Sequence, residues 1–393
     1  MQHRPAAAAR QSTIERKDLD RLFEVLRARG YTVLGPVARG GAIVWDEFSA
    51  ADELPAGWTD EQGAGRYRLT PSDGAALFDW TVGPASPKTS LHPAAITLLE
   101  ARREGAGLQL LEGDPRSAKL AFFGLRACEL AAIAVQDRIL LGGTTIDPVY
   151  RARREGALLI AVQCGRAGGT CFCASMGTGP EVRSGHDLVL TELLEGGRHV
   201  FVAEAGSERG GELLAELRGT ASTAAETGAA RAAVARATTG MGRTLETEGL
   251  PALLAQSQEH PHWDVIAARC LACGNCTSVC PTCFCVTTED FTDLAAGGYP
   301  RGAWVSRRVR RWDSCFSVDF TYIHGGNVRS SIRSRFRQWL THKLGSWHEQ
   351  FGSSGCVGCG RCITWCPAGI DITEEARALR QRKHGKEESR GNA

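Results

Sequence analysis

The chain lacks the long apolar run that a membrane-spanning helix needs. Such a helix takes roughly 18 to 20 consecutive apolar residues, and no segment of the 393 residues approaches that length. The opening residues, MQHRPAAAAR, also lack the apolar core of a secretion signal. Together these absences predict a cytoplasmic protein with no membrane span.

An excess of one charge and the common nucleotide-binding loops are missing too. The formal net charge is only +2, so the whole-chain balance gives no support for a nucleic-acid partner. No Gly-x-Gly-x-x-Gly follows an expected strand, and no Walker-type loop or catalytic triad stands out. We therefore assign no catalytic residue, and we expect any flavin or pyridine nucleotide to be bound by a partner.

Cysteine is absent from the first 127 residues, yet the chain contains 15 cysteines. An odd number of cysteines, in a sequence that shows no export signal, argues against a disulfide framework and for metal ligation. The cysteines therefore indicate where the chemistry of this chain lies.

Hydrophobic periodicity predicts an α+β fold. An amphipathic helix is expected after a capping-box pattern at residues 12–15, because Leu19, Leu22, Phe23 and Leu26 recur at helical spacing before Gly30. Residues 119–124, 128–141 and 156–162 follow a strand-helix-strand pattern, and residues 187–194 and 199–203 follow a hairpin pattern. The segment 46–90 shows no regular pattern, and the Ala-rich segment 220–240 predicts a solvated helix or a linker.

Composition then suggests three parts of the chain. We expect a mixed α/β N-terminal region over residues 1–255. Because eight of the 15 cysteines lie in two tight runs with ferredoxin spacing, we expect a bacterial-ferredoxin-like dicluster domain over residues 256–376. An Arg-rich segment is inserted in that domain at about residues 290–350, and residues 377–393 form a charged tail.

Two cysteine runs carry the strongest signal in the sequence. They are Cys270-x2-Cys273-x2-Cys276-x3-Cys280-Pro281 and Cys356-x2-Cys359-x2-Cys362-x3-Cys366-Pro367. In ferredoxins, three closely spaced thiolates wrap one cluster from a tight loop, while the fourth, before proline, ligates the neighbouring cluster. A pair of zinc sites is the alternative for four-cysteine sets, but a repeated run ending in Cys-Pro favours two [4Fe-4S] clusters. The predicted ligands are Cys270, Cys273, Cys276 and Cys366 for the first cluster, and Cys356, Cys359, Cys362 and Cys280 for the second.

Glycines within these runs fit the same interpretation. Gly274, Gly358 and Gly360 would let the backbone approach a cluster, where N–H groups can bond to sulfur. Ordinary turn glycines are the alternative.

Seven cysteines remain outside the two runs: Cys128, Cys164, Cys171, Cys173, Cys283, Cys285 and Cys315. Four of them form two copies of the tetrapeptide Thr-Cys-Phe-Cys, which places two sulfurs where they can ligate one metal or neighbouring irons. We hypothesise at least one further iron–sulfur cluster, with Cys164, Cys171 and Cys173 and with Cys283, Cys285 or Cys315 among its ligands. For Cys128, a small buried apolar side chain is an equal alternative.

The segment from Arg301 to Lys343 is strongly basic. Ten Lys or Arg against Asp313 and Asp319 leave a local balance of +8. The ten are Arg301, Arg307, Arg308, Arg310, Arg311, Arg329, Arg333, Arg335, Arg337 and Lys343. Such a stripe could bind nucleic acid, dock an acidic subunit, offset the negative charge of thiolate-ligated clusters, or form a solvated basic face. The cysteine runs on both sides favour docking or charge compensation.

Four motifs resemble the beta subunits of sulfhydrogenases, which are the iron–sulfur subunits of cytoplasmic NAD(P)-linked [NiFe]-hydrogenases. The motifs are Phe122–Leu130, Asp147–Tyr150 with Arg153 and Arg154, Cys171–Pro180, and Trp312–Cys315. The A subunit of anaerobic sulfite reductase shares the pattern. The resemblance runs from about residue 118 to 373 and weakens in the first hundred residues.

The resemblance implies a non-catalytic electron-transfer subunit. Its expected partners are a flavin subunit that handles NAD(P)H and the small and large hydrogenase subunits; the alternative partners are sulfite reductase subunits. A nucleic-acid-binding protein with structural clusters is a third interpretation, drawn from the arginines. A stand-alone ferredoxin would not need an N-terminal region of this length.

Overall fold

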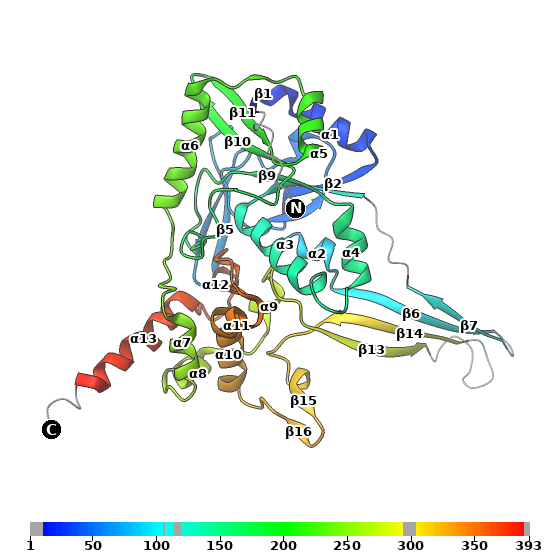
Figure 1. Ribbon diagram of the computed structural model, residues 1–393, viewed down its shortest axis with the longest axis vertical. Helices are drawn as coiled ribbons and strands as arrows, with labels where there is room; N and C mark the ends of the chain where they lie inside the picture. The colour runs from blue at the N-terminus through cyan, green and yellow to red at the C-terminus, as the bar shows by residue number, and fades with distance from the viewer. Residues whose placement is uncertain (1–10, 105–106, 114–118, 294–303, 389–393) are drawn as a thin grey trace, which may run out of the picture.

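A mixed eight-stranded sheet dominates the N-terminal part of the chain, in a computed structural model that describes residues 11–104, 107–113, 119–293 and 304–388. The sheet lies at one end of the molecule, the cysteine-rich helical part lies at the other, and a four-stranded arm projects from the side (Figure 1). The predicted α+β class is confirmed.

The large sheet has the strand order β12-β1-β11-β10-β9-β8-β2-β3. In chain order its strands are β1 (Gln11–Glu15), β2 (Tyr31–Arg39), β3 (Ala42–Glu47), β8 (Lys119–Leu125), β9 (Leu158–Val162), β10 (Leu188–Glu195), β11 (Arg198–Ala205) and β12 (Thr220–Ala221). The four central strands β2, β8, β9 and β10 run parallel. Every residue of β9 is buried, as expected for a parallel strand covered on both faces.

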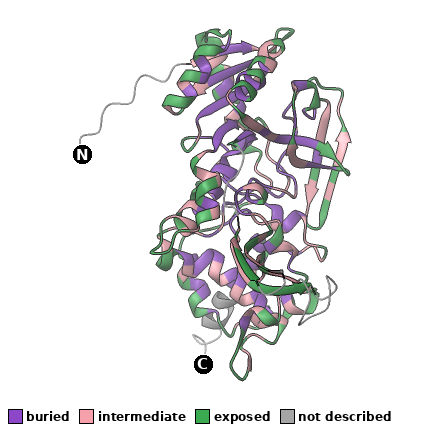
Figure 2. Cartoon of the chain, turned by 90° about the vertical axis from the view of Figure 1, so that its right-hand side faces the viewer, coloured by how far each residue is buried: buried purple, intermediate pink, exposed green. Residues whose placement is uncertain are grey.

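Helices cover the two faces of this sheet. Alternate residues of β8 enter different cores: Ala121 and Phe123 pack with α1 (Leu19–Ala28) and α5 (Glu208–Glu216), whereas Leu120 and Phe122 pack with α3 (Ala127–Leu140) and α4 (Pro148–Glu155). Helix α6 (Ala224–Thr239) packs on β10 and β11. Figure 2 shows buried residues along the strands of this sheet as well as in the helical part of the molecule.

The strand-helix-strand unit β8-α3-β9 and the hairpin β10-β11 confirm the sequence predictions, and the Ala-rich segment is helical. The predicted capping box at residues 12–15 is wrong. These residues form β1, which pairs with β11 and buries Thr13 and Ile14, so tertiary pairing overrides the local capping pattern.

The C-terminal part consists mainly of short helices. They are α7 (Leu250–Gln256), α8 (His262–Arg269), α9 (Asn275–Ser278), α10 (Ile332–Thr341), the π-helical segment η4 (His342–Ser346), α11 (Trp347–Phe351), α12 (Arg361–Thr364) and α13 (Ile372–Glu388). Their core gathers Leu254, Trp263, Phe336 and Trp339. The predicted boundary at residue 255 falls at the end of α7, which packs in this core. Helix α13 continues into the predicted tail, and residues 389–393 lie outside the described ranges.

A four-stranded arm joins the two parts of the chain. Its order is β13-β14-β6-β7, with β6 (Ala95–Glu104), β7 (Gly107–Glu112), β13 (Val286–Asp293) and β14 (Trp304–Trp312). Because β6 pairs with β14, the N-terminal region and the Arg-rich segment share one sheet.

Further elements are short: η1 (Arg16–Asp18), η2 (Ala51–Glu53), β4 (Trp58–Gly63), β5 (Arg66–Pro71), α2 (Lys88–Leu91), η3 (Asp319–Thr321), β15 (Tyr322–Ile323) and β16 (Gly326–Asn327). The β4-β5 hairpin falls in the stretch that shows no regular sequence pattern. Its tip contacts the second cysteine run, where Gly65 N donates to Ile363 O at 3.0 Å. Within the described ranges, no helix combines the length and the apolar character that crossing a bilayer requires.

Candidate iron–sulfur centres

The two cysteine runs fold alike. In each run the third residue has a positive φ, 51° at Ala272 and 63° at Gly358. The fifth residue of each run is again left-handed, with φ of 73° at Gly274 and 77° at Gly360, and each precedes a one-turn helix, α9 or α12. Glycine adopts this conformation without steric cost, so three of these four positions follow directly from the sequence.

These turns aim backbone donors at the cysteine sulfurs. The sulfurs of Cys270 and Cys356 each accept the N–H of the residue two positions later, at 3.4 Å. The sulfur of Cys366 accepts the N–H of Ile370 at 3.4 Å. Hydrogen bonds to sulfur tune the potential of an iron–sulfur cluster, so the loops already present the donor arrangement that such a cluster uses.

The predicted first set of cysteines lines one cavity of about 30 Å³. The set is Cys270, Cys273, Cys276 and Cys366, and apolar side chains that include Phe336 and Trp339 close the cavity. Cys273 is exposed whereas the other three are half-buried. This set therefore lies at the edge of the helical part, close to the surface.

The predicted second set also comes together, deeper in the protein. Burial raises the pKa of the Cys362 thiol well above its ordinary value, and the neighbouring thiols of Cys356, Cys359 and Cys280 raise it further. Cys276 from the first set acts on the same thiol. The two sets are therefore neighbours, as the ferredoxin arrangement requires.

A buried lysine stands beside the second set. Lys343 donates from Nζ to Thr282 Oγ1 at 2.9 Å and to Gly355 O at 3.3 Å, and the Thr282 hydroxyl lies 3.1 Å from Cys280 Sγ. Burial works against the ammonium charge, but nearby thiolates, led by Cys280, hold the pKa of Lys343 well above its ordinary value. The lysine therefore places a positive charge where cysteine thiolates gather.

A buried arginine connects the second run to the β8-α3 unit. The side chain of Arg361 is 1% exposed, and its Nη2 pairs with Glu129 Oε1 at 2.6 Å. Its Nε donates to Gly83 O at 2.8 Å. Burial disfavours this charge, whereas Glu129 and then the thiolates of Cys359 and Cys128 keep the pKa of Arg361 above its ordinary value.

Four of the remaining cysteines line a separate cavity. Cys164, Cys171 and Cys173 line a cavity of about 20 Å³, and Cys128 completes its sulfur lining. The structure thus joins Cys128 to the group that the sequence placed in an additional site.

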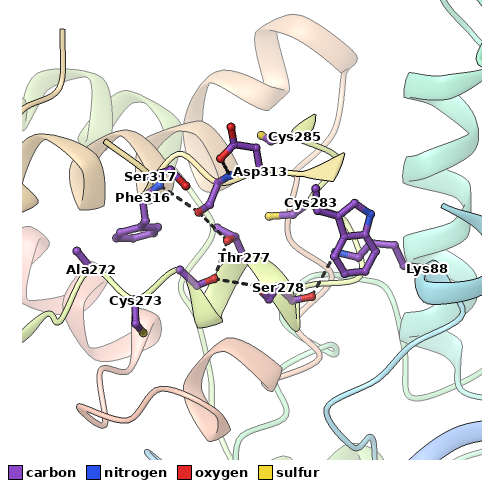
Figure 3. Close-up of a pocket in the computed structure, with 13 residues that line it drawn as sticks. Lys88, Ala272, Cys273, Thr277, Ser278, Cys283, Cys285, Asp313, Phe316 and Ser317 are labelled. Carbon is purple, nitrogen blue, oxygen red and sulfur yellow. Dashed lines mark hydrogen bonds between the residues drawn. The ribbon is translucent and has the colours of Figure 1, made fainter. Parts of the chain in front are cut away.

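The other three remaining cysteines lie elsewhere. Cys283 and Cys285 line an open cavity of about 250 Å³, together with Lys88, Trp312 and Asp313 (Figure 3). Burial, and then Cys285, raises the pKa of Cys315 to about 12. The two Thr-Cys-Phe-Cys segments therefore line different cavities.

Most of the predicted basic stripe is paired within the chain. Four arginines of β14 pair with carboxylates: Arg307 with Glu100 at 2.6 Å, Arg308 with Asp290 at 2.8 Å, Arg311 with Glu289 at 3.5 Å, and Arg310 with Asp147. Arg333 and Arg337 pair with Glu259 at 3.0 and 3.1 Å. Arg301 lies outside the described residues. These intrachain partners weaken the nucleic-acid interpretation, because paired guanidinium groups are less available to phosphates.

Sequence reasoning missed the buried cations Arg126 and Arg361 and the carboxylate Glu129. Arg126 and Glu129 both lie in the Phe122–Leu130 motif that carried the resemblance, and Arg361 lies inside the second cysteine run. The sequence did offer a signal, namely the charged residues inside these motifs. A charged side chain is rarely buried without a partner, so charges of opposite sign in such motifs indicate a buried pair.

Among the described residues, no group of three or more His, Cys, Asp or Glu side chains forms a site for a single metal ion. A [4Fe-4S] cluster binds its four thiolates at four different irons, so its ligands stand farther apart than those of one ion.

Comparison with known proteins agrees with the site. A 4Fe-4S dicluster domain matches residues 269–370. The chain is also 28% identical over 368 residues to Sulfhydrogenase 2 subunit beta of Pyrococcus furiosus, which covers 91% of this chain and 94% of that protein. The predicted resemblance is confirmed, and so is the prediction of two [4Fe-4S] clusters. The chain is therefore similar to that subunit over nearly its whole length and is an iron–sulfur electron-transfer protein.

Proposed function

We propose that this chain is the subunit that relays electrons between a flavin subunit handling NAD(P)H and a [NiFe]-hydrogenase module, in the cytoplasm. The observation that carries the proposal is the pair of adjacent cysteine sets, in a chain similar over nearly its whole length to a sulfhydrogenase beta subunit. The chain itself performs no substrate chemistry in this proposal.

We assign the first cluster to Cys270, Cys273, Cys276 and Cys366, and the second to Cys356, Cys359, Cys362 and Cys280. A bound [4Fe-4S] cluster supplies one-electron transfer at a potential set by its surroundings. The protein supplies the thiolates, the N–H donors to sulfur and a largely apolar enclosure. Lys343 and Arg361 offset part of the negative charge that thiolate ligation brings into the interior.

The surface beside the first set is the expected docking site for one redox partner. Cys273 is exposed, and Leu271, between two ligands of the first set, is 66% exposed. An apolar side chain this exposed next to a redox centre fits an interface core, because association buries apolar surface. We therefore expect a partner subunit to cover Leu271.

Anaerobic purification through a tag on this chain, from the native organism, tests the proposed complex. Hydrogenase and flavin subunits should copurify, with hydrogen-dependent NAD(P) reduction. Copurification of sulfite reductase subunits with sulfite reduction would instead assign the chain to that system. Leu271→Asp should reduce the yield of one partner, whereas Leu194→Asp, at an exposed leucine of the distant β10-β11 hairpin, should not. A chain that purifies alone under native conditions would contradict the proposal.

A further inference from the structure

We propose that Cys128, Cys164, Cys171 and Cys173 hold a third [4Fe-4S] cluster. All four lie outside the matched dicluster domain, so this site goes beyond the proposed function and does not depend on which partner subunits bind. The cavity that they line measures about 20 Å³, close to the 30 Å³ at the first cysteine set.

The fold explains why Cys128 and Cys164 meet. Strands β8 and β9 are parallel neighbours. Cys128 lies three residues after the end of β8, in the first turn of α3, and Cys164 lies two residues after the end of β9. The carboxyl ends of neighbouring parallel strands in an α/β sheet are where such folds bind ligands.

The loop after β9 brings the other two sulfurs to the same place. Phe172 N donates to Gly358 O at 2.8 Å, which fixes the Cys171-Phe172-Cys173 segment against the second cysteine run. The approach is close, because a Cβ atom on Gly358 would lie 2.7 Å from the Cys173 Cα. Cys171 Sγ lies 4.0 Å from Cys359 O. The third set therefore adjoins the second, which adjoins the first.

Two buried guanidinium groups stand beside the third set. Arg126 is 3% exposed and donates from Nη2 to Trp80 O at 2.8 Å and to Phe78 O at 3.1 Å. It interacts with the Cys164 thiol. Arg361 interacts with Cys359 of the second set and then with Cys128, so it lies between the second and third sets. Among the described residues, Arg126 Nε and Arg361 Nη1 are buried without a hydrogen-bond partner.

Such unpaired donors cost free energy in a protein interior. Thiolates and the sulfides of a cluster are acceptors that carry negative charge, so a bound cluster would accept from these unpaired donors and offset the charge of Arg126. The charge of Arg361 is already paired with Glu129. Buried free cysteines by themselves are common. Four of them from three chain segments around one cavity, beside two buried cations, match the donor set and the charge that a cluster needs.

Quantitative iron and acid-labile sulfide analysis of the full chain, reconstituted without oxygen, tests the site. Wild-type protein should hold about twelve irons, roughly four for each of three clusters, and Mössbauer spectra should assign all of them to [4Fe-4S] clusters. The double variant Cys171→Ala/Cys173→Ala should lose about four irons and keep the spectra of the other two clusters, which also shows that it folds.

Two further variants make the test specific. Met241→Leu changes a side chain that lines the same cavity but should leave the iron content unchanged. Cys315→Ser changes a thiol that stands beside Cys276 of the first set and outside the third cavity, and it should also retain all the iron. A wild-type plateau at about eight irons, a zinc ion in place of the third cluster, or loss of the extra iron in Cys315→Ser instead of the double variant would overturn the proposal.

Discussion

Removing the charge of Lys343 should lower the reduction potential of the second cluster. The ammonium stands beside Cys280, one of the thiolates assigned to that cluster, and is joined to it through the Thr282 hydroxyl. A positive charge stabilises the added electron of the reduced state more than it stabilises the oxidised state. Lys343→Met and Lys343→Gln should therefore both make the cluster harder to reduce.

The structure sets the size of the effect. The two hydrogen-bond distances, 2.9 and 3.1 Å, place Nζ within about 6 Å of Cys280 Sγ. At an effective dielectric constant of about 20, two unit charges at about 6 Å interact by roughly 3 kcal/mol. That energy corresponds to about 130 mV for one electron. Because the electron spreads over irons that lie beyond the sulfur, we expect a shift of about 50 to 100 mV.

An anaerobic redox titration followed by EPR measures the shift. Lys343→Gln separates charge from hydrogen bonding, because the amide can still donate to the Thr282 hydroxyl. Arg209→Met is the control, since it removes a cation that pairs with Asp187 beside the large sheet. Equal potentials in wild type and both Lys343 variants, or a shift as large in Arg209→Met, would refute the reasoning.

Three further predictions concern stability and are measured by unfolding experiments without oxygen. Gly358→Ala should lower the free energy of unfolding by about 1–3 kcal/mol more than Gly249→Ala does. Both positions have positive φ, but only at Gly358 would the new Cβ meet the backbone of another segment. Equal losses in the two variants would show that this close approach is unimportant. Arg361→Met should lower the free energy of unfolding by about 3–5 kcal/mol, because it leaves the Glu129 carboxylate without its ion-pair partner. Adding Glu129→Gln to the same chain should restore part of that loss. A double variant no more stable than Arg361→Met would argue against the pair. Burial lowers the pKa of His92 to about 4, so below its unfolded pKa of about 6.5 the unfolded state binds more protons and stability falls, by about 2 kcal/mol at pH 5. His92→Phe should remove this loss of stability at low pH. A variant whose stability falls with pH as steeply as that of the wild type would contradict the prediction.

The ligands of the dicluster domain could be predicted because local spacing determines their geometry. Cys270, Cys273 and Cys276 occupy a single turn-rich loop, and the left-handed positions at Gly274 and Gly360 are glycines, so residue type and conformation agree. Ala272 was the exception. It adopts a left-handed backbone conformation although it is not a glycine, and nothing in its local sequence indicates this.

Contacts between distant segments could not be predicted in the same way. Strands β6 and β14 pair across about 200 residues of sequence, and that pairing brings Glu100 to Arg307. In the sequence, where the pairing of β6 with β14 is not visible, these arginines form a basic stripe without partners. The third cysteine set is similar, because Cys128 meets Cys171 only when β8 and β9 pair. The strand-helix-strand pattern and two cysteines just beyond its strands were the available signal.

Electron flow through the intact complex tests the central claim most directly. Freeze-quench EPR of the complex exposed to hydrogen should show reduced [4Fe-4S] signals from this chain, followed by their reoxidation when NAD(P)⁺ is added. In the Cys276→Ala variant, which lacks one ligand of the first cluster, hydrogen-dependent NAD(P) reduction should be lost while the complex still reduces an artificial dye with hydrogen. Full NAD(P) reduction in that variant would contradict the account, because electrons would then bypass the first cluster.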